Sequence, residues 1–153
     1  AVRYPRGGEG AYYTGCGSDA LADCLCEGTD CTVLSYGVLV NHALEAARRL
    51  EAEGISVRVV KLNRIAPLDG GEIAEVLRGT RRLVVLEDCL ARGCVGERVA
   101  ALLAETGEEP ERLVLKNAGE SLPPQGTVPQ LEHALGLDAD GVAESVKEVL
   151  HEQ

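Results

Sequence analysis

Two kinds of hydrophobic pattern alternate from Cys31 to the C-terminus. Short apolar runs rich in Val, Leu and Ile are typical of buried β-strands, and apolar residues recurring every three or four positions are typical of amphipathic helices. Strand and helix patterns alternate four times, which predicts a mainly parallel sheet, because each parallel crossover needs a helix that covers a face of the sheet. We therefore expect an α/β fold, a three-layer α/β/α sandwich.

The predicted elements follow each other closely. Strands are expected at 32–36, 55–62, 83–86 and 113–115, and helices at 39–50, 69–77, 95–103, 127–135 and 138–150. The third strand is apolar throughout, as expected for a strand that is covered on both faces. Thr127 and Gln130 form a capping-box pattern, and Asp138 is a second candidate N-cap.

The first thirty residues have a different character. Residues 7–29 contain six glycines and three of the six cysteines, and they show little apolar periodicity. Such a segment is typical of a loop or linker. We therefore divide the chain into an inter-domain linker and loop at 1–30 and an α/β domain at 31–153. The opening at Ala1, without a Met, suggests a domain cut from a longer protein.

Six cysteines raise the question of a metal site or disulfides. Cys16, Cys24, Cys26 and Cys31 are spaced by eight, two and five residues, and Cys89 and Cys94 by five. Neither group contains the C-x-x-C pair typical of a zinc site, so we predict no metal ligands. Without a secretory signal, free thiols are expected. A free-standing cysteine-rich binding or redox module remains an alternative.

The acidic net charge argues against a nucleic-acid partner. The formal net charge is −10, whereas nucleic-acid binding requires a basic stripe. The sequence also contains no apolar run long enough for a membrane span and no signal-peptide pattern. The composition predicts a soluble, cytoplasmic protein with no nucleic-acid or membrane partner.

Several short motifs, in order along nearly the whole chain, carry a family resemblance. They are Ala1-Val-Arg-Tyr-Pro-Arg-Gly7, Thr32-Val-Leu-Ser-Tyr-Gly37, Leu62-Asn-Arg-Ile-Ala-Pro-Leu-Asp69, Val85-Leu-Glu-Asp88 with Gly93 and Gly96, and Gln125-Gly-Thr127 before Leu135-Gly-Leu-Asp138. Together they resemble the C-terminal domain of the 1-deoxy-D-xylulose-5-phosphate synthases, in the transketolase superfamily. The first and third motifs are the most specific.

The resemblance implies a transferase. Its members join pyruvate to glyceraldehyde 3-phosphate with loss of CO2, for isoprenoid and thiamine biosynthesis, using thiamine diphosphate and Mg²⁺. The resemblance implies that these cofactors belong to upstream domains of the same polypeptide and that the enzyme is a homodimer. The resemblance also implies a five-stranded sheet with one antiparallel strand. We expect no bound cofactor and no catalytic residue in this domain, which should be inactive alone.

Arg3 and Arg6 are the candidate substrate ligands. The resemblance implies that Arg3 helps to bind the phosphate of the aldehyde substrate, and Arg6 is a second candidate. A guanidinium is always charged and can bind phosphate oxygens through two parallel hydrogen bonds. The alternative is a solvated linker with ordinary ion pairs. Tyr4 is a candidate for an interface or site-facing surface.

Glu87 and Asp88 end the third predicted strand, where open α/β sheets place their ligands. Paired carboxylates can exchange protons or hold a metal. The alternative, which we prefer, is stabilisation of the following helix, since acidic groups favour a helix N-terminus. The resemblance implies that this loop faces other domains or the dimer partner.

The remaining polar candidates have plainer interpretations. His42, His133 and His151 have no Ser, Cys or carboxylate at a spacing typical of a catalytic triad. Arg78, Arg81 and Arg82 precede a strand and are interpreted as charge compensation at a helix C-terminus. A related alternative for the whole chain is the last domain of a transketolase or of a two-oxoacid dehydrogenase beta subunit, which docks a partner protein.

Overall fold

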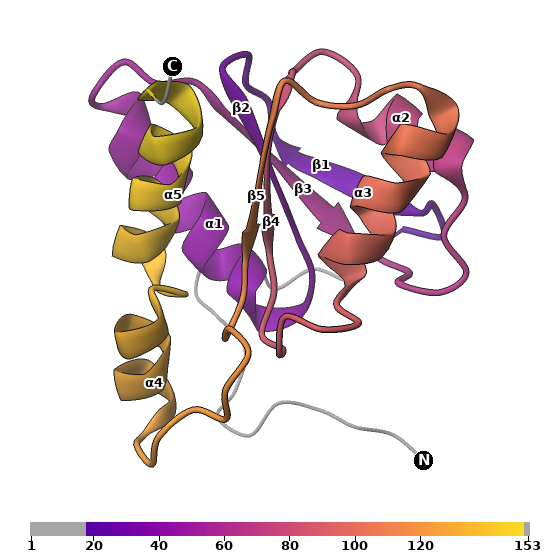
Figure 1. The fold of residues 1–153 in the computed structure, drawn as a ribbon. Helices are drawn as coiled ribbons and strands as arrows, with labels where there is room; N and C mark the ends of the chain where they lie inside the picture. The colour runs from indigo at the N-terminus through magenta and orange to yellow at the C-terminus, as the bar shows by residue number, and fades with distance from the viewer. Residues whose placement is uncertain (1–17, 152–153) are drawn as a thin grey trace.

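The computed structural model describes residues 18–151, which form a five-stranded sheet between two layers of helices (Figure 1). The strands are β1 Ala22–Cys26, β2 Cys31–Ser35, β3 Val57–Leu62, β4 Arg82–Leu86 and β5 Arg112–Lys116, in the order β1-β3-β2-β4-β5. The helices are the 3-10 turn η1 Gly37–Leu39, α1 Val40–Glu51, α2 Gly70–Leu77, α3 Val95–Thr106, α4 Val128–Leu135 and α5 Ala139–His151. The predicted α/β/α sandwich is confirmed.

Two apolar cores explain the layers. One lies between the sheet and helices α1 and α5, and the other lies between the sheet and helices α2 and α3. Strand β2 occupies the centre of the sheet, so all five of its residues are buried. Neighbouring residues alternate between the cores, with Val33 in the first and Leu34 in the second, as the pleat of a strand requires.

The fifth strand corrects one prediction. Residues 22–26, expected to be part of a loop or linker, form β1, which pairs antiparallel with β3. The register shifts between Cys24, opposite Val60, and Cys26, opposite Val59, so Leu25 is an extra residue in a bulge. β1 is a short edge strand with a charged residue, Asp23, at its second position. The bulge also interrupts the alternation of apolar and polar residues from which a strand is predicted.

The helix N-termini expected at Asp69, Thr127 and Asp138 are confirmed. The Asp69 side chain accepts a hydrogen bond from the Glu72 amide at 3.0 Å and caps α2. The capping box at α4 forms, with the Thr127 amide donating to Gln130 Oε1 at 3.0 Å. Asp138 accepts from the Gly141 amide at 2.9 Å at the start of α5. No helix in the described part of the chain is long and apolar enough to cross a membrane.

Candidate functional site at the carboxyl ends of β2 and β4

The centre of the sheet contains a topological switch point. Strands β2 and β4 are parallel neighbours, but the helices that follow them, α1 and α3, cover opposite faces. Open α/β sheets bind ligands in the crevice that this divergence leaves at the carboxyl ends of the strands. Here the crevice is bordered by Tyr36, which follows β2, and Glu87, which follows β4.

The Glu87 carboxylate fills this position. The residue is 1% exposed, although most glutamates lie at the surface. Its Oε1 accepts a hydrogen bond from the Gly96 amide at 2.7 Å, and its Oε2 accepts from the Val95 amide at 2.8 Å. The Tyr36 hydroxyl donates to Oε2 at 3.0 Å, and Cys89 Sγ lies 3.7 Å from the same oxygen. All four partners are donors, which is the environment that an ionised carboxylate requires.

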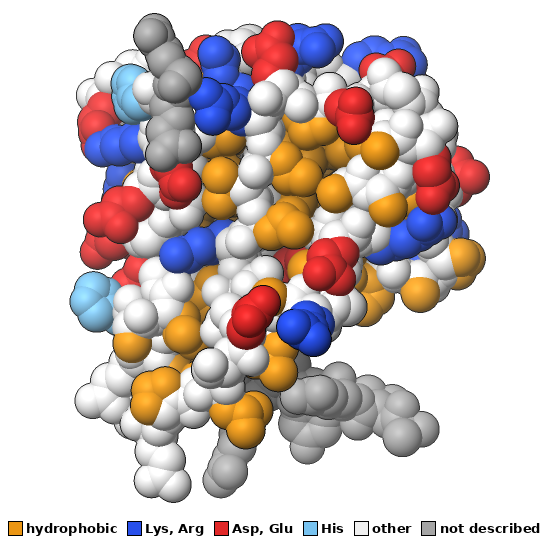
Figure 2. All heavy atoms as spheres, viewed as in Figure 1, with side chains coloured by type: hydrophobic (Ala, Val, Ile, Leu, Met, Phe, Trp, Pro, Cys, Tyr) orange, Lys and Arg blue, Asp and Glu red, His pale blue; other side chains and the backbone are white. Residues whose placement is uncertain are grey.

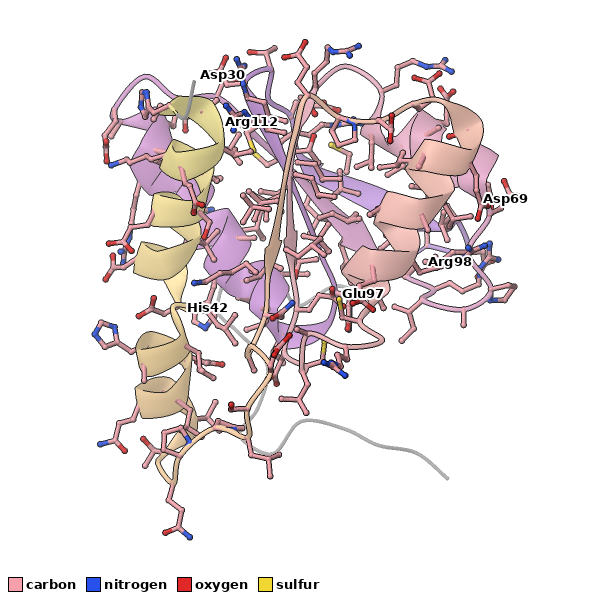
Figure 3. All side chains as sticks on the ribbon, viewed as in Figure 1. Asp30, His42, Asp69, Glu97, Arg98 and Arg112 are labelled. Atoms are coloured by element: carbon pink, nitrogen blue, oxygen red, sulfur yellow. The ribbon has the colours of Figure 1, made fainter. Side chains whose placement is uncertain are left out.

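Gly96 makes this arrangement possible. A Cβ at this position would lie 2.8 Å from Glu87 Oε1 and 2.8 Å from Leu115 Cδ2. The first turn of α3 therefore approaches the end of β4 so closely that a side chain at position 96 would have to displace the Glu87 carboxylate or the Leu115 side chain. A second carboxylate, that of Glu97, accepts from the Gly93 amide at 2.8 Å and lies at the same turn (Figure 3). The sequence does show glycines at 93 and 96, but their contact with Glu87 depends on tertiary structure.

The chemical consequence is that the chain supplies its own anion. The exposed amides and the dipole at a helix N-terminus usually bind phosphate or a carboxylate. In α3 the amides of Val95 and Gly96 are already bound by Glu87. This arrangement is the helix-stabilising role that we preferred for Glu87. Asp88, by contrast, is exposed, so the two adjacent carboxylates do not form a pair.

The environment also keeps the neighbouring groups protonated. Burial and the Glu87 carboxylate raise the pKa of Tyr36 above its ordinary value. Burial, followed by Glu87, raises the pKa of Cys89 to about 11. Burial likewise raises the pKa of Cys94. A thiol must be deprotonated to act as a nucleophile, so these cysteines are poor nucleophiles at neutral pH.

The five cysteines of the described residues are not grouped as metal ligands. In the described residues all of them are free, and no three or more His, Cys, Asp or Glu side chains are placed to hold a metal ion. The bulge in β1 puts Cys24 opposite Val60 and Cys26 opposite Val59, whose side chains belong to different cores. Cys24 and Cys26 therefore face opposite sides of the sheet. Cys16 lies outside the described residues.

Two of the three histidines contact carboxylates. His42 Nε2 lies 3.2 Å from Glu132 Oε2 and joins α1 to α4, as its place in Figure 3 shows. His133 Nδ1 lies 2.7 Å from Asp138 Oδ2. That hydrogen bond, with the charge of Asp138, raises the pKa of His133. His151 is exposed at the end of α5.

The remaining predicted residues either form ion pairs or lie outside the described residues. Arg78 pairs with Glu75 at 2.7 Å, and Arg81 with Glu111 at 2.8 Å, so both have local acidic partners. Arg3, Tyr4 and Arg6 lie outside the described residues, so their roles stay predictions.

Comparison with known proteins identifies the family. The model of the transketolase C-terminal domain matches residues 20–142, most of the described chain. The chain belongs to the transketolase C-terminal domain family. The match begins two residues before β1, so this transketolase C-terminal domain includes the antiparallel edge strand that was assigned to the linker.

The relatives of this transketolase C-terminal domain are longer proteins. A 1-deoxy-D-xylulose-5-phosphate synthase 1 of Geobacter sulfurreducens is 32% identical over 98% of the chain and 24% of its own length. A 2-oxoisovalerate dehydrogenase beta subunit of Bacillus subtilis is 33% identical over 84% of the chain and 39% of its own length. A solved split-gene transketolase, described as an inactive beta4 tetramer, superposes with a TM-score of 0.81 at 31% identity, covering 94% of this chain and 47% of that one. The chain thus spans less than half of each.

Proposed function

We propose that the chain is the C-terminal domain of a 1-deoxy-D-xylulose-5-phosphate synthase, a transferase that converts pyruvate and glyceraldehyde 3-phosphate into 1-deoxyxylulose 5-phosphate and CO2 for isoprenoid and thiamine biosynthesis. The main support is the extent of the synthase matches. They cover 98% of the chain in Geobacter sulfurreducens and 96% in Chlorobium phaeovibrioides, and so extend into the Arg3–Gly7 motif at the start. The dehydrogenase subunit from Bacillus subtilis matches 84%.

Thiamine diphosphate and Mg²⁺ belong, in this proposal, to the upstream domains. The described residues do not fit either group: no acidic or histidine cluster among them is placed to hold a metal, and the α3 amides that would suit a diphosphate are bound by Glu87. The domain would serve as architecture in a homodimeric enzyme and would be inactive alone. We place the enzyme in the cytoplasm, in keeping with the free cysteines of the described residues.

Arg3 and Arg6 would contribute the substrate chemistry of this chain, as ligands of the aldehyde phosphate. The Glu87–Asp88 loop and Tyr4 would face the upstream domains or the dimer partner. Exposure of Asp88 at the carboxyl edge of the sheet supports a contact role for the loop, whereas buried Glu87 would act by holding the loop and α3 in place.

Steady-state kinetics of the full-length polypeptide tests this proposal. Wild-type protein with thiamine diphosphate and Mg²⁺ should form 1-deoxyxylulose 5-phosphate, and the 153-residue chain alone should not. Arg3→Ala should raise KM for glyceraldehyde 3-phosphate about ten- to a hundredfold, because a charge-assisted hydrogen bond contributes roughly 1.5–3 kcal/mol. KM for pyruvate is the internal control. An unchanged KM for the aldehyde would remove Arg3 from the site.

A dehydrogenase beta subunit is the second candidate, since the Bacillus subtilis relative is as similar in identity as the synthases. Such a chain would be one subunit of a larger enzyme and would dock a partner protein. Pyruvate decarboxylation that needs a second polypeptide and is indifferent to glyceraldehyde 3-phosphate would favour this candidate.

A further inference from the structure

The two outermost strands of the sheet are built differently. β1 and β5 each have one side with which no other described strand pairs. Such edges readily pair with other chains, and proteins protect them with bulges, charges or prolines. β1 is protected in this way, because its register shifts at Leu25 and Asp23 lies within it. β5 has no bulge and no proline, and its only charges are at its two ends, Arg112 and Lys116.

Two residues of β5 direct their backbone groups to the open side. In a parallel pair, alternate residues of a strand bond to the same neighbour. The Glu87 amide donates to the Lys116 carbonyl at 2.9 Å, so residues 112, 114 and 116 are those that bond toward β4. The amides and carbonyls of Leu113 and Leu115 therefore point away from β4. In the described part of the chain, no backbone hydrogen bond outside the β4–β5 ladder reaches these two residues.

The side chains beside this edge are apolar and only partly covered. Leu113 and Leu115 pack against the core next to α2 and α3, whereas Val114 packs against the core next to α1 and α5. All three are partly buried, because β5 has a neighbouring strand on one side only. β5 runs between α5 and α3 in Figure 1, and hydrophobic side chains form a band in the same part of the surface in Figure 2. A strand added here would cover apolar surface on both faces of the sheet.

Charge selects the kind of strand that can be added. Arg112 and Lys116 lie on the same face of the sheet as Val114, because side chains alternate along a strand. Opposite charges directly across a sheet stabilise the pair, and like charges destabilise it. A second β5 centred on Val114 would place cation opposite cation in either direction, so pairing between two copies is disfavoured. The edge instead favours a segment with acidic residues four positions apart and apolar or β-branched residues between them.

We propose that the outer side of β5 docks an extended segment of this acidic type from a partner protein, as a sixth strand of the sheet. The backbone of the segment would pair with Leu113 and Leu115, and its acidic residues would face Arg112 and Lys116. In this mode of recognition, main-chain hydrogen bonds provide affinity and alternate side chains provide specificity. The inference is independent of the proposed enzyme activity, since no catalytic group takes part.

A synthetic seven-residue peptide tests the proposal. The probe is fluorescein-labelled Thr-Glu-Val-Thr-Val-Glu-Thr, and its control has Lys in place of both Glu. By fluorescence anisotropy at low ionic strength, the 153-residue chain should bind the acidic peptide about tenfold more tightly, because two cross-strand pairs change from repulsive to attractive. The net charge of −10 would favour the basic peptide in non-specific binding, so the expected preference is diagnostic. Equal affinities, or no binding of the acidic peptide, would overturn the proposal.

Amide hydrogen exchange locates the bound peptide. With the acidic peptide at about ten times its Kd, the amides of Leu113 and Leu115 should exchange about tenfold more slowly, since protection grows with ligand concentration relative to Kd. The amides at 112, 114 and 116 already bond toward β4, so they should change less and are the internal reference. The amides of β1, at 22–26, are the control for the opposite edge. Protection at β1, or equal protection of all residues from 112 to 116, would contradict docking at this edge.

Charge variants separate local pairing from long-range attraction. Lys116→Glu should weaken binding of the acidic peptide about threefold and abolish its preference over the Lys peptide, because one cross-strand pair changes sign. Arg98→Glu, on α3, changes the net charge equally and should leave the preference intact. Lys116→Gln, which only removes the charge, should reduce the preference to about threefold and serves if Lys116→Glu lowers the melting temperature. The same loss of preference in Arg98→Glu would overturn the site.

Other occupants of the β5 edge give different results. A second copy would produce a concentration-dependent dimer of the 153-residue chain, with slow exchange at Leu113 and Leu115 in the absence of peptide. Upstream domains would protect the same amides in the full-length polypeptide and block the peptide. Either result would overturn the proposal. Peptide binding to a full-length protein that forms no 1-deoxyxylulose 5-phosphate would support docking and reject only the synthase assignment.

Discussion

The Tyr36 hydroxyl and the Glu87 carboxylate, 51 residues apart in sequence, lie 3.0 Å apart and join the ends of β2 and β4. The same Glu87 oxygen binds the first amide of α3, so one buried side chain connects two strands and a helix. The crevice in which this fold type usually binds a ligand is thereby closed by the chain itself. This arrangement supports the proposed architectural role of the domain.

Tyr36→Phe should destabilise the domain moderately. The change removes one hydrogen bond to a charged acceptor without changing the ring, and we expect a loss of about 1.5 kcal/mol in the free energy of unfolding. Glu87→Gln should cost more, about 3 kcal/mol, because either orientation of the new amide would place its NH2 group against the backbone N–H of Val95 or of Gly96. Urea unfolding of the 153-residue chain measures both. Asp88→Asn, the exposed neighbour, should stay within about 0.5 kcal/mol of wild type; equal losses at 87 and 88 would contradict the role of Glu87.

Gly96→Ala should destabilise the domain although alanine favours helices. The new Cβ would lie 2.8 Å from both Glu87 Oε1 and Leu115 Cδ2, and such overpacking costs about 1–3 kcal/mol. Gly71→Ala, in the first turn of α2, meets only the capping oxygen Asp69 Oδ1, at 3.3 Å, and should cost less than Gly96→Ala because alanine favours helices. Thermal unfolding compares the two variants, and a stabilised Gly96→Ala would show that this close approach is not required.

His133 should make a pH-dependent contribution to stability. Its hydrogen bond to Asp138 raises its folded-state pKa above the unfolded value of 6.5. The contribution is therefore fully present below pH 6.5 and is lost as the pH rises through the folded-state pKa. An NMR titration of the imidazole should give a lower pKa in Asp138→Asn, which retains an N-cap side chain for α5. The same imidazole pKa in both proteins would show that the contact is absent in solution.

The cysteines should differ sharply in reactivity. Cys24 is exposed, whereas Cys31 is fully buried and burial raises its pKa to about 12. A thiol reagent at pH 8, followed by mass spectrometry of peptides, should label Cys24 in the native protein and Cys31 only after unfolding. Equal labelling of the two in the native protein would mean that the first core opens readily.

The elements that could be predicted are those with local causes. Hydrophobic periodicity located four strands and five helices, and Asp69, Thr127 and Asp138 marked helix starts because a cap acts within three residues. Val85-Leu-Glu-Asp88 also marked the correct end of the sheet, since the carboxyl ends of parallel strands share an edge. The chain's own residues thus determined the fold class and the edge where function should be sought.

Tertiary structure decided the rest. β1 forms a strand because it pairs with the open edge of β3. The two strands are more than thirty residues apart in sequence, so the local residue pattern of β1 does not indicate the pairing. The sequence placed Glu87 at a strand end, but only the fold brings the Tyr36 hydroxyl and the amides of α3 to its carboxylate. Contacts between distant segments depend on the path of the whole chain, whereas periodicity and capping depend on neighbours.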